Sequence, residues 1–272
     1  MLGAGLSFAV MASALKALPG HLPASEITFI RSFFSTMAII ACFFQQQKFE
    51  GPGKRPGVLA ARGIIGFIAL FLYFWALPQL HLGTAVMLNY TAPLFAVVAS
   101  YFIFKDKANI RVKFLIALSF LGVYLLAVPQ ISERPAAFLA ALTSGFLAGM
   151  VHLLIRQSFG EDEPPLLIIF YFTAICTMGS LFFLPFTRWV WPDTRQWALL
   201  IVITMTSFFG QLGLTYSLRK APVSVVSPFG YITPVISLVF GFLIWREDPG
   251  LAGILGSVLV IFCGTLLYKQ QA

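Results

Sequence analysis

One pattern occurs twice along this chain, and an internal repeat decides which architectures are open to a sequence. The first copy covers residues 76–109, the second covers residues 217–250, and the two align without a gap. Each copy holds a long apolar segment that contains a proline, and each has a basic residue followed by an acidic one near its end. The matched positions include Tyr90 with Tyr231, Pro93 with Pro234, Lys105 with Arg246, and Asp106 with Glu247.

The composition predicts a protein that lies in a lipid bilayer. Apolar residues make up 59% of the sequence and charged residues only 10%, whereas a soluble domain is about 25% charged. So few charged groups cannot solvate a globular surface, and the apolar side chains are therefore expected to face lipid. The net charge of +8 does not indicate nucleic acid as a partner, because the Lys and Arg residues lie in short pieces between apolar runs.

The apolar residues are grouped into segments that could cross a membrane. A spanning helix needs about 20 apolar residues, and helices are expected rather than strands because lipid does not tolerate open sheet edges. Short connections rich in Pro and Gly separate the segments and leave no soluble domain over. We predict an all-α membrane protein with ten transmembrane helices, at Leu2–Leu18, Ser25–Phe44, Val58–Leu77, Leu82–Phe104, Ile110–Val128, Ala136–Ile155, Leu166–Phe186, Trp197–Leu218, Val223–Trp245 and Leu251–Tyr268.

The basic residues predict how the chain lies in the membrane. If the N-terminus is cytoplasmic, the outer loops carry only Arg134, Arg188, Arg195 and Arg246, and the other loop Lys and Arg residues lie inside. Cytoplasmic loops are enriched in Lys and Arg, so both termini are expected in the cytoplasm. We expect a multi-pass protein of a bacterial inner membrane without a signal peptide, since nothing basic precedes the first apolar run.

The repeat and the expected topology together predict an inverted architecture. The repeated stretches are the third and fourth segments and the eighth and ninth, which places five helices in each copy. Because five is odd, the second copy enters the membrane from the opposite side. The predicted repeats are residues 1–130 and 131–272. Inverted repeats of this kind are the usual construction of secondary transporters, which expose a central site to each side of the membrane in turn.

Prolines at matched positions predict where a solute would bind. A proline inside a helix leaves the carbonyl four residues earlier without its hydrogen bond, which a membrane protein tolerates only where other groups or water satisfy it. Breaks at corresponding positions of two halves indicate a transport site. The alternative is that the prolines only shape the bundle. The expected breaks are Pro93 in the fourth segment and Pro228 and Pro234 in the ninth.

Polar and aromatic side chains near these breaks are the candidates for lining a central cavity. Each offers a hydrogen bond, and the aromatic ones add a flat apolar wall, which suits a small, flat or partly apolar metabolite. The alternative for each residue is a hydrogen bond between helices or an anchor at the membrane interface. The candidates are Tyr73, Trp75, Asn89, Tyr90, Thr91, Gln211, Tyr216, Ser227, Tyr231 and Thr233.

Ionisable residues inside spanning segments are functional candidates. Lys16, Glu26 and Arg31 lie near the outer ends of the first two segments, and His152 lies in the sixth. As alternatives, Lys16 can snorkel to the interface and His152 can be a satisfied core residue. Arg62, near the inner end of the third segment, is expected to snorkel. Because basic residues outnumber acids at depth, the sequence favours an anionic or carboxylate-bearing substrate.

The sequence contains no pattern typical of catalysis or cofactor binding. It has neither a Walker loop nor an H-E-x-x-H motif, so we expect no enzyme activity, no cofactor and no metal site. Cys42, Cys176 and Cys263 fall in apolar runs, and their spacing fits neither a disulfide framework nor a metal site. They are expected to be small packing residues.

Four stretches occur in an order that is typical of one family: EITFIRSFF at Glu26–Phe34, ARGIIGFIALFLYFWALPQLHLGTAVMLNYTAPLF at Ala61–Phe95, EPPLLIIFYF at Glu163–Phe172 and LRKAPVSVVSPFGYITPV at Leu218–Val235. Through them the chain resembles the drug/metabolite transporter superfamily, specifically its EamA-type members. The resemblance implies ten helices in an inverted five-plus-five repeat, alternating access, and a cavity lined mainly by the third, fourth, eighth and ninth helices, with the fifth and tenth as scaffold. Such proteins move amino acids, nucleotide-related compounds, cofactors, amphiphiles and toxic metabolites, often outward. The chain departs from the family at Lys105-Asp106, where Gly-Glu is usual.

The function predicted from the sequence is secondary-active transport of a small metabolite, as an exporter or exchanger. Two alternatives are a membrane-embedded enzyme acting on a lipid-like substrate and a membrane scaffold that transports nothing. The enzyme would need a cluster of acids or histidines facing one cavity, and the scaffold would not need matched helix breaks. The expected partners are a small-molecule substrate and the lipid bilayer. Since the chain carries both halves, it can work as a monomer, with a dimer as the alternative.

Overall fold

The computed structural model describes most of the chain and places it almost entirely in helices. Pro93 lies outside the described residues, and so do the side chains of Ser227 and Pro228. The described residues are 1–18, 22–46, 51–92, 94–96, 110–127, 133–160, 163–187, 189–220 and 227–270.

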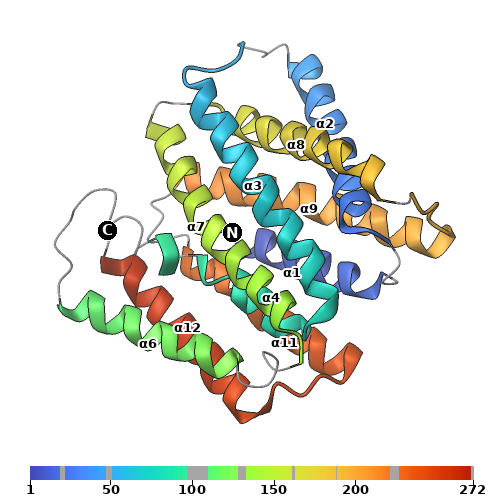
Figure 1. Cartoon of the computed structure of the whole chain (residues 1–272). Helices are drawn as coiled ribbons and strands as arrows, with labels where there is room; N and C mark the ends of the chain where they lie inside the picture. Colours follow the sequence, from blue (N-terminus) through green and yellow to red (C-terminus); the bar gives the residue numbers. More distant parts are fainter. Residues whose placement is uncertain are drawn as a thin grey trace.

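The described residues form ten α-helices, five in each half of the chain, and three short 3₁₀ helices (Figure 1). In the first half they are α1 (Leu2–Ala17), α2 (Ala24–Gln46), α3 (Pro56–Ala76), η1 (Leu77–Gln79), α4 (Leu82–Asn89) and α6 (Ile110–Ala127). In the second half they are α7 (Pro135–Gly160), α8 (Pro165–Phe183), η2 (Leu184–Phe186), α9 (Thr194–Lys220), η3 (Ser227–Tyr231), α11 (Ile232–Trp245) and α12 (Gly250–Gln270).

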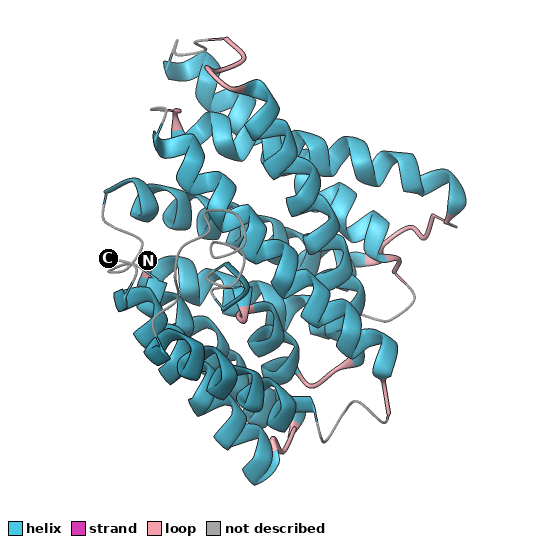
Figure 2. Cartoon of the chain, turned by 60° about the vertical axis from the view of Figure 1, so that its left-hand side comes forward, coloured by secondary structure: helices cyan, strands magenta, loops and turns pink. Residues whose placement is uncertain are grey.

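The length and composition of the helices confirm the predicted class, an all-α integral membrane protein. Five described helical stretches are long and apolar enough to cross a bilayer, and they belong to α2, α3, α7, α8 and α9. Shorter apolar helices lie at Leu2–Ala17, Lys113–Leu126, Phe229–Trp245 and Gly250–Leu266. In the part of the chain that is described, Figure 2 shows helices joined by loops and no strand.

Local sequence signals account for where several helices begin and end. Pro56 and Pro165 stand at the first positions of α3 and α8, where a missing N–H costs nothing. At the start of α9, the backbone N–H of Asp193 donates to Gln196 Oε1, and the N–H of Gln196 donates to Asp193 Oδ1. This is a reciprocal capping box. Helix α11 ends at Arg246, whose φ of 53° is the left-handed conformation that terminates helices.

The helices pack in pairs that are symmetric under exchange of the two halves. The contact of α1 with α9 corresponds to the contact of α7 with α3. In the same way, α1 with α11 corresponds to α7 with α4, and α2 with α9 corresponds to α8 with α3. The remaining large contacts join counterparts, which are α2 with α8, α4 with α11, and α6 with α12. Figure 1 shows α6 and α12 side by side at one end of the molecule and α2 with α8 at the other.

Two contacts join residues that occupy matched positions of the halves. The hydroxyl oxygens of Thr36 in α2 and Thr177 in α8 lie 3.4 Å apart, although they are separated by 141 residues. Tyr90 and Tyr231 have the same separation, and their ring centroids lie 6.5 Å apart. A residue can meet its own counterpart only close to an axis that relates the halves. Both contacts therefore lie where an exchange axis would pass.

The carboxylates of Glu163 and Glu247 join the connections into two sets, one at each end of the helices. Glu163 Oε1 accepts hydrogen bonds from the backbone N–H groups of Lys54, at 2.7 Å, and Arg55, at 2.9 Å. Glu247 forms an ion pair with Lys16 and accepts from the N–H of Leu82 at 2.7 Å. We call these the Glu163 side, which holds the starts of α3 and α8, and the Glu247 side, which holds the end of α1 and the start of α4.

Two predicted segments differ from the observed helices. The segment predicted at Leu82–Phe104 is interrupted, because α4 ends at Asn89 and Tyr90 forms a turn. The segment predicted at Val223–Trp245 has no single helix, because η3 precedes α11. Pro234 is thus the third residue of α11 rather than a kink inside a longer helix, and its missing N–H falls in the first turn.

The contact between α6 and α12 depends on two glycines that face each other. A methyl group at Gly256 would lie 2.6 Å from the carbonyl oxygen of Gly122, and one at Gly122 would lie 2.9 Å from that of Gly256. The backbones of the two helices approach so closely that a side chain does not fit. Small residues permit this kind of contact in membranes, where helix association depends on close packing.

We predict that Gly256→Ala lowers the stability of the protein by about 1–3 kcal/mol, because the added methyl overpacks this contact. Thermal unfolding of the purified protein in detergent measures the effect. Gly3→Ala is the control, since nothing lies within 4 Å of a methyl group there. Equal unfolding temperatures for Gly256→Ala and the wild type would contradict the proposed packing.

Candidate functional site

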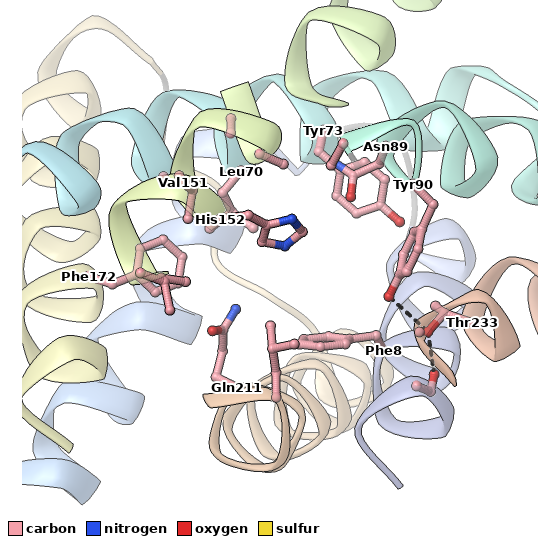
Figure 3. A pocket seen from close by; sticks show the side chains of 18 of the residues that line it. Phe8, Leu70, Tyr73, Asn89, Tyr90, Val151, His152, Phe172, Gln211 and Thr233 are labelled. Atoms are coloured by element: carbon pink, nitrogen blue, oxygen red, sulfur yellow. Dashed lines mark hydrogen bonds between the residues drawn. The ribbon is translucent and has the colours of Figure 1, made fainter. Parts of the chain in front are cut away.

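A cavity of about 210 Å³ lies between the two halves of the bundle. Its walls come from α1, α2, α3, α4, α7, α8, α9 and the η3–α11 connection. The described residues of α6 and α12 are not in this wall. Most of the wall is apolar and aromatic, with a few polar groups that converge on the space (Figure 3). This composition is typical of small-molecule sites.

The cavity brings together eight of the residues selected from the sequence. The polar and aromatic candidates that line it come from α3, α4 with its C-cap, α9, η3 and α11, and the ionisable ones come from α2 and α7. They are Tyr73, Asn89, Tyr90, Gln211, Tyr231 and Thr233, together with Arg31 and His152.

Three of the other candidates lie elsewhere. Trp75 follows Tyr73 by two positions, which turns it about 200° around the helix, and 41% of its surface is exposed. Tyr216 is five positions from Gln211 and is also exposed, at 38%. Thr91 is fully buried, and its hydroxyl donates to the carbonyl of Leu88 at 2.6 Å. These three residues do not line the cavity, so the prediction that they do so is wrong.

Lys16 and Glu26 also lie outside the cavity wall. Lys16 does not snorkel, because its ammonium pairs with Glu247 and donates to the carbonyl of Leu80. Glu26 is buried, and its Oε2 accepts from the N–H of Val190 at 3.1 Å. Both residues therefore hold connections together at the ends of helices.

The break in α4 is covered by close packing of α7. A methyl group at Gly149 would lie 2.6 Å from the carbonyl oxygen of Ala92, and one at Gly145 would lie 2.7 Å from Thr91 Oγ1. The side chain of Asn89 donates to Ser144 Oγ at 3.0 Å. The chain thus buries its interrupted backbone against protein, as lipid requires, and places the next residue, Tyr90, in the cavity wall.

A chain of hydrogen bonds connects the breaks of the two halves. The hydroxyl of Tyr90 donates to Thr233 Oγ1 at 2.8 Å, and Thr233 donates to the carbonyl of Gly5 at 3.0 Å. Figure 3 shows these bonds as dashed lines along one wall of the cavity. The chain ties α4, α11 and α1 together beside the space.

Arg31 and Arg62 are the charged residues of the cavity wall, and both are 2% exposed. Arg31 donates to Ser207 Oγ through Nε, while its Nη1 has no partner. Arg62 Nε and Nη1 have no partner either. The guanidinium carbon of Arg62 lies 4.1 Å from the ring centre of Phe172, and that of Arg31 lies 5.8 Å from it.

The expectation that Arg62 snorkels is wrong. It is the seventh residue of α3, so its guanidinium stays at the depth of Phe172 in α8 instead of reaching the interface. The sequence signal that could have identified it is its position inside the apolar run. A charge one full turn or more inside a spanning segment is a functional candidate.

His152 and Gln211 complete the polar part of the wall. Both project into the cavity, from α7 and α9 respectively (Figure 3). His152 Nδ1 and Gln211 Oε1 are buried and have no hydrogen-bond partner. Unsatisfied buried polar atoms are rare in native proteins. Here His152 Nδ1 and Gln211 Oε1 belong to residues that line one space, which is the arrangement expected of a site that a ligand completes.

The cavity lies toward the Glu163 side of the bundle. Its wall includes Met1 at the start of α1, Ile155 and Leu218 near the ends of α7 and α9, and Gly230 in η3. All four positions belong to helix ends on the Glu163 side. On the Glu247 side, the ion pair and the hydrogen bonds of Glu247 connect α1, α4 and α11. These contacts tie the helix ends together on that side.

The family whose model matches this chain is described as the EamA-like transporter family, and the match covers residues 1–128 and again 135–268. The pseudopaline exporter CntI of Pseudomonas aeruginosa is 29% identical over 98% of this chain and 94% of its own length. The S-adenosylmethionine uptake transporter of Rickettsia prowazekii is 23% identical over 90% of this chain and 83% of its own length. A protein of known crystal structure has a TM-score of 0.67 at 18% identity, covering all of this chain and 96% of the other.

We predict that Tyr90→Phe destabilises the protein by about 1–2 kcal/mol, because Thr233 loses a buried donor. Thermal unfolding in detergent measures the change. Tyr124→Phe in α6 is the matched control, since Tyr124 is 64% exposed. A change of the same size in both variants would show that the hydrogen bond to Thr233 contributes nothing.

Proposed function

The chain belongs to the EamA-like transporter family, and we propose that it is a secondary-active carrier that exports a small metabolite by alternating access. The observation that carries the proposal is the cavity between the two halves, with unpaired polar atoms in its wall. A scaffold would not need such a space. The relatives that span most of the chain are named as carriers of small molecules.

We infer that the two halves are inverted repeats. The family model matches each half separately, the helix contacts are symmetric under exchange, and Thr36 meets its counterpart Thr177. Two halves of like structure can exchange conformations at little cost in energy, because each can take the role of the other. In that exchange the cavity closes on one side of the membrane and opens on the other.

Export is the direction that the expected orientation supports. If both termini are cytoplasmic, the Glu163 side faces the cytoplasm, and the cavity lies toward the compartment that supplies an exported solute. The relative that matches 98% of the chain is named as an exporter, while the relative from Rickettsia is named for uptake. Alternating access permits both directions, and the solute gradient or the coupled ion decides between them.

The ion pair of Lys16 and Glu247 is the proposed gate on the Glu247 side. It ties the end of α1 to the connection between α11 and α12, and both partners make a further hydrogen bond to the segment between α3 and α4. These contacts exist only while the side is closed. Removing them should therefore destabilise the closed conformation and increase the population that is open to the Glu247 side.

We predict that Glu247→Gln makes the floor of the cavity reachable from the Glu247 side. A cysteine introduced at Met11, which is 5% exposed and lies in the cavity wall, should react several times faster with a membrane-impermeant thiol reagent added there. Cys42, Cys176 and Cys263 are first replaced. The control is Asp248→Asn at the neighbouring exposed position. An unchanged rate in Glu247→Gln would contradict the gate.

Counterflow in proteoliposomes tests transport itself. Vesicles are loaded with one unlabelled metabolite per batch, and transient accumulation of the same labelled compound is followed. We expect accumulation of at least one small metabolite, recovered chemically unchanged, in vesicles that contain the protein and not in protein-free vesicles. A chemically altered product would favour the membrane-embedded enzyme, and absence of counterflow with the whole metabolite set would contradict the carrier.

A further inference from the structure

The two guanidinium groups of the cavity wall differ from the other buried charges of the described structure. The partly buried Lys16 pairs with Glu247, Glu163 accepts backbone N–H bonds, and Glu26 accepts one through Oε2, while its Oε1 has no partner. Arg31 and Arg62, in contrast, have no carboxylate within ion-pair distance among the described residues. Their neighbours include the rings of Phe74 and Phe172, the hydroxyl of Ser207 and the thiol of Cys176.

This arrangement does not stabilise the fold. Burial of a charge is unfavourable unless the charge is paired, and two like charges beside one aromatic ring repel each other. A cation–π contact compensates only a small part of that cost. An anionic group of a solute in the cavity would supply the negative charge, and Arg31 Nη1, Arg62 Nε and Arg62 Nη1 are the unpaired donors near it.

We propose that Arg31 and Arg62 bind the carboxylate group of an organic acid that is the substrate of the carrier. This rests on the proposed function, since it names the class of solute. Planar guanidinium groups match the geometry of a carboxylate and form strong charge-assisted hydrogen bonds with it. Most of the rest of the wall is apolar and aromatic, with Phe8, Leu70 and Phe172 among its members, and it therefore holds a largely apolar or flat remainder of the molecule.

The same geometry orients the substrate. The guanidinium groups lie on α2 and α3, while the counterpart of Arg31, 141 residues further on, is Phe172. His152 and Gln211 lie on α7 and α9, and the hydroxyls of Tyr90 and Thr233 lie beyond them. The position that carries a charge in the first half is thus occupied by an uncharged residue in the second half. The carboxylate lies toward α2 and α3, and the polar groups of the remainder lie toward α9 and α11.

Ligand-induced stabilisation tests the binding. The full chain in nanodiscs is heated with phenylacetate, benzoate and indole-3-acetate, each beside its neutral amide, and with inorganic phosphate. We expect at least one carboxylate to raise the unfolding temperature. Its amide should bind with an apparent affinity at least about tenfold lower. In Arg62→Met, the difference between the acid and its amide should disappear. Arg111→Met, at an exposed position of α6, is the matched control and should leave it intact.

Stability without ligand gives a second readout that a structural role would not produce. Since an unpaired buried charge is costly and an apolar side chain of similar size is not, Arg62→Met should raise the unfolding temperature of the ligand-free protein by about 2 °C or more. A residue that holds the fold together would give the opposite sign.

The outcomes separate this proposal from the proposed function. Equal shifts by acid and amide, a shift by phosphate alone, no shift by any carboxylate, or a lower unfolding temperature in ligand-free Arg62→Met would each overturn the carboxylate site. Counterflow of a neutral solute would then leave the carrier standing. Carboxylate binding that depends on Arg62, without counterflow of any bound acid, would support the site and overturn the carrier.

Discussion

The structure depends on one constraint, which is that every backbone N–H and C=O group inside a bilayer must find a partner within the protein. The constraint explains why the described chain is helical and why its helix breaks are covered. Where α4 ends at Asn89, glycines of α7 bring a second backbone close enough to exclude lipid. The counterpart break at η3 lies beside α1, where Thr233 donates to Gly5. The interrupted backbone is thus covered by protein, and the cavity lies beside it because helices that stop short leave room between the halves.

The same constraint acts on charge. Ionised groups that stabilise the fold are paired at the ends of the helices, as Lys16 and Glu247 are, or accept backbone hydrogen bonds, as Glu163 does. Arg31 and Arg62 lie in the cavity wall without a carboxylate partner in the described part of the chain. If only the stability of the fold were selected, other residues would be expected at these two positions. Proteins give up stability mainly where function requires it. The paired charges at the helix ends therefore hold the bundle together, and the two guanidinium groups in the cavity wall are available to bind a solute.

The class, the family and most of the helices could be predicted from the sequence, because segment length and composition decide them directly. The cavity wall could be predicted only in part. Tyr73 and Trp75 are equivalent by composition, yet only Tyr73 faces the cavity, because α3 is apolar on all sides and periodicity does not show which face turns inward. The sequence places Arg62 at the interface, since the distance from a helix end does not reveal that α8 covers it. It does not show that α11 starts at Ile232, because an apolar 3₁₀ turn has the same composition as a helix. The two repeats remain an inference from the matched contacts.

The central claim is that the two ends of the cavity open in alternation, and distances between spin labels measure this directly. One pair of labels is placed at Gln79 and Asp248, which are exposed on the Glu247 side, and another at Gly57 and Arg219, which are exposed on the Glu163 side. Pulsed electron resonance in nanodiscs then records both distances with and without a transported solute. Alternating access predicts that the solute increases the population with the longer label distance on the Glu247 side. On the Glu163 side, the population with the longer label distance should decrease. Distances that both stay constant, or that lengthen together, would contradict the account.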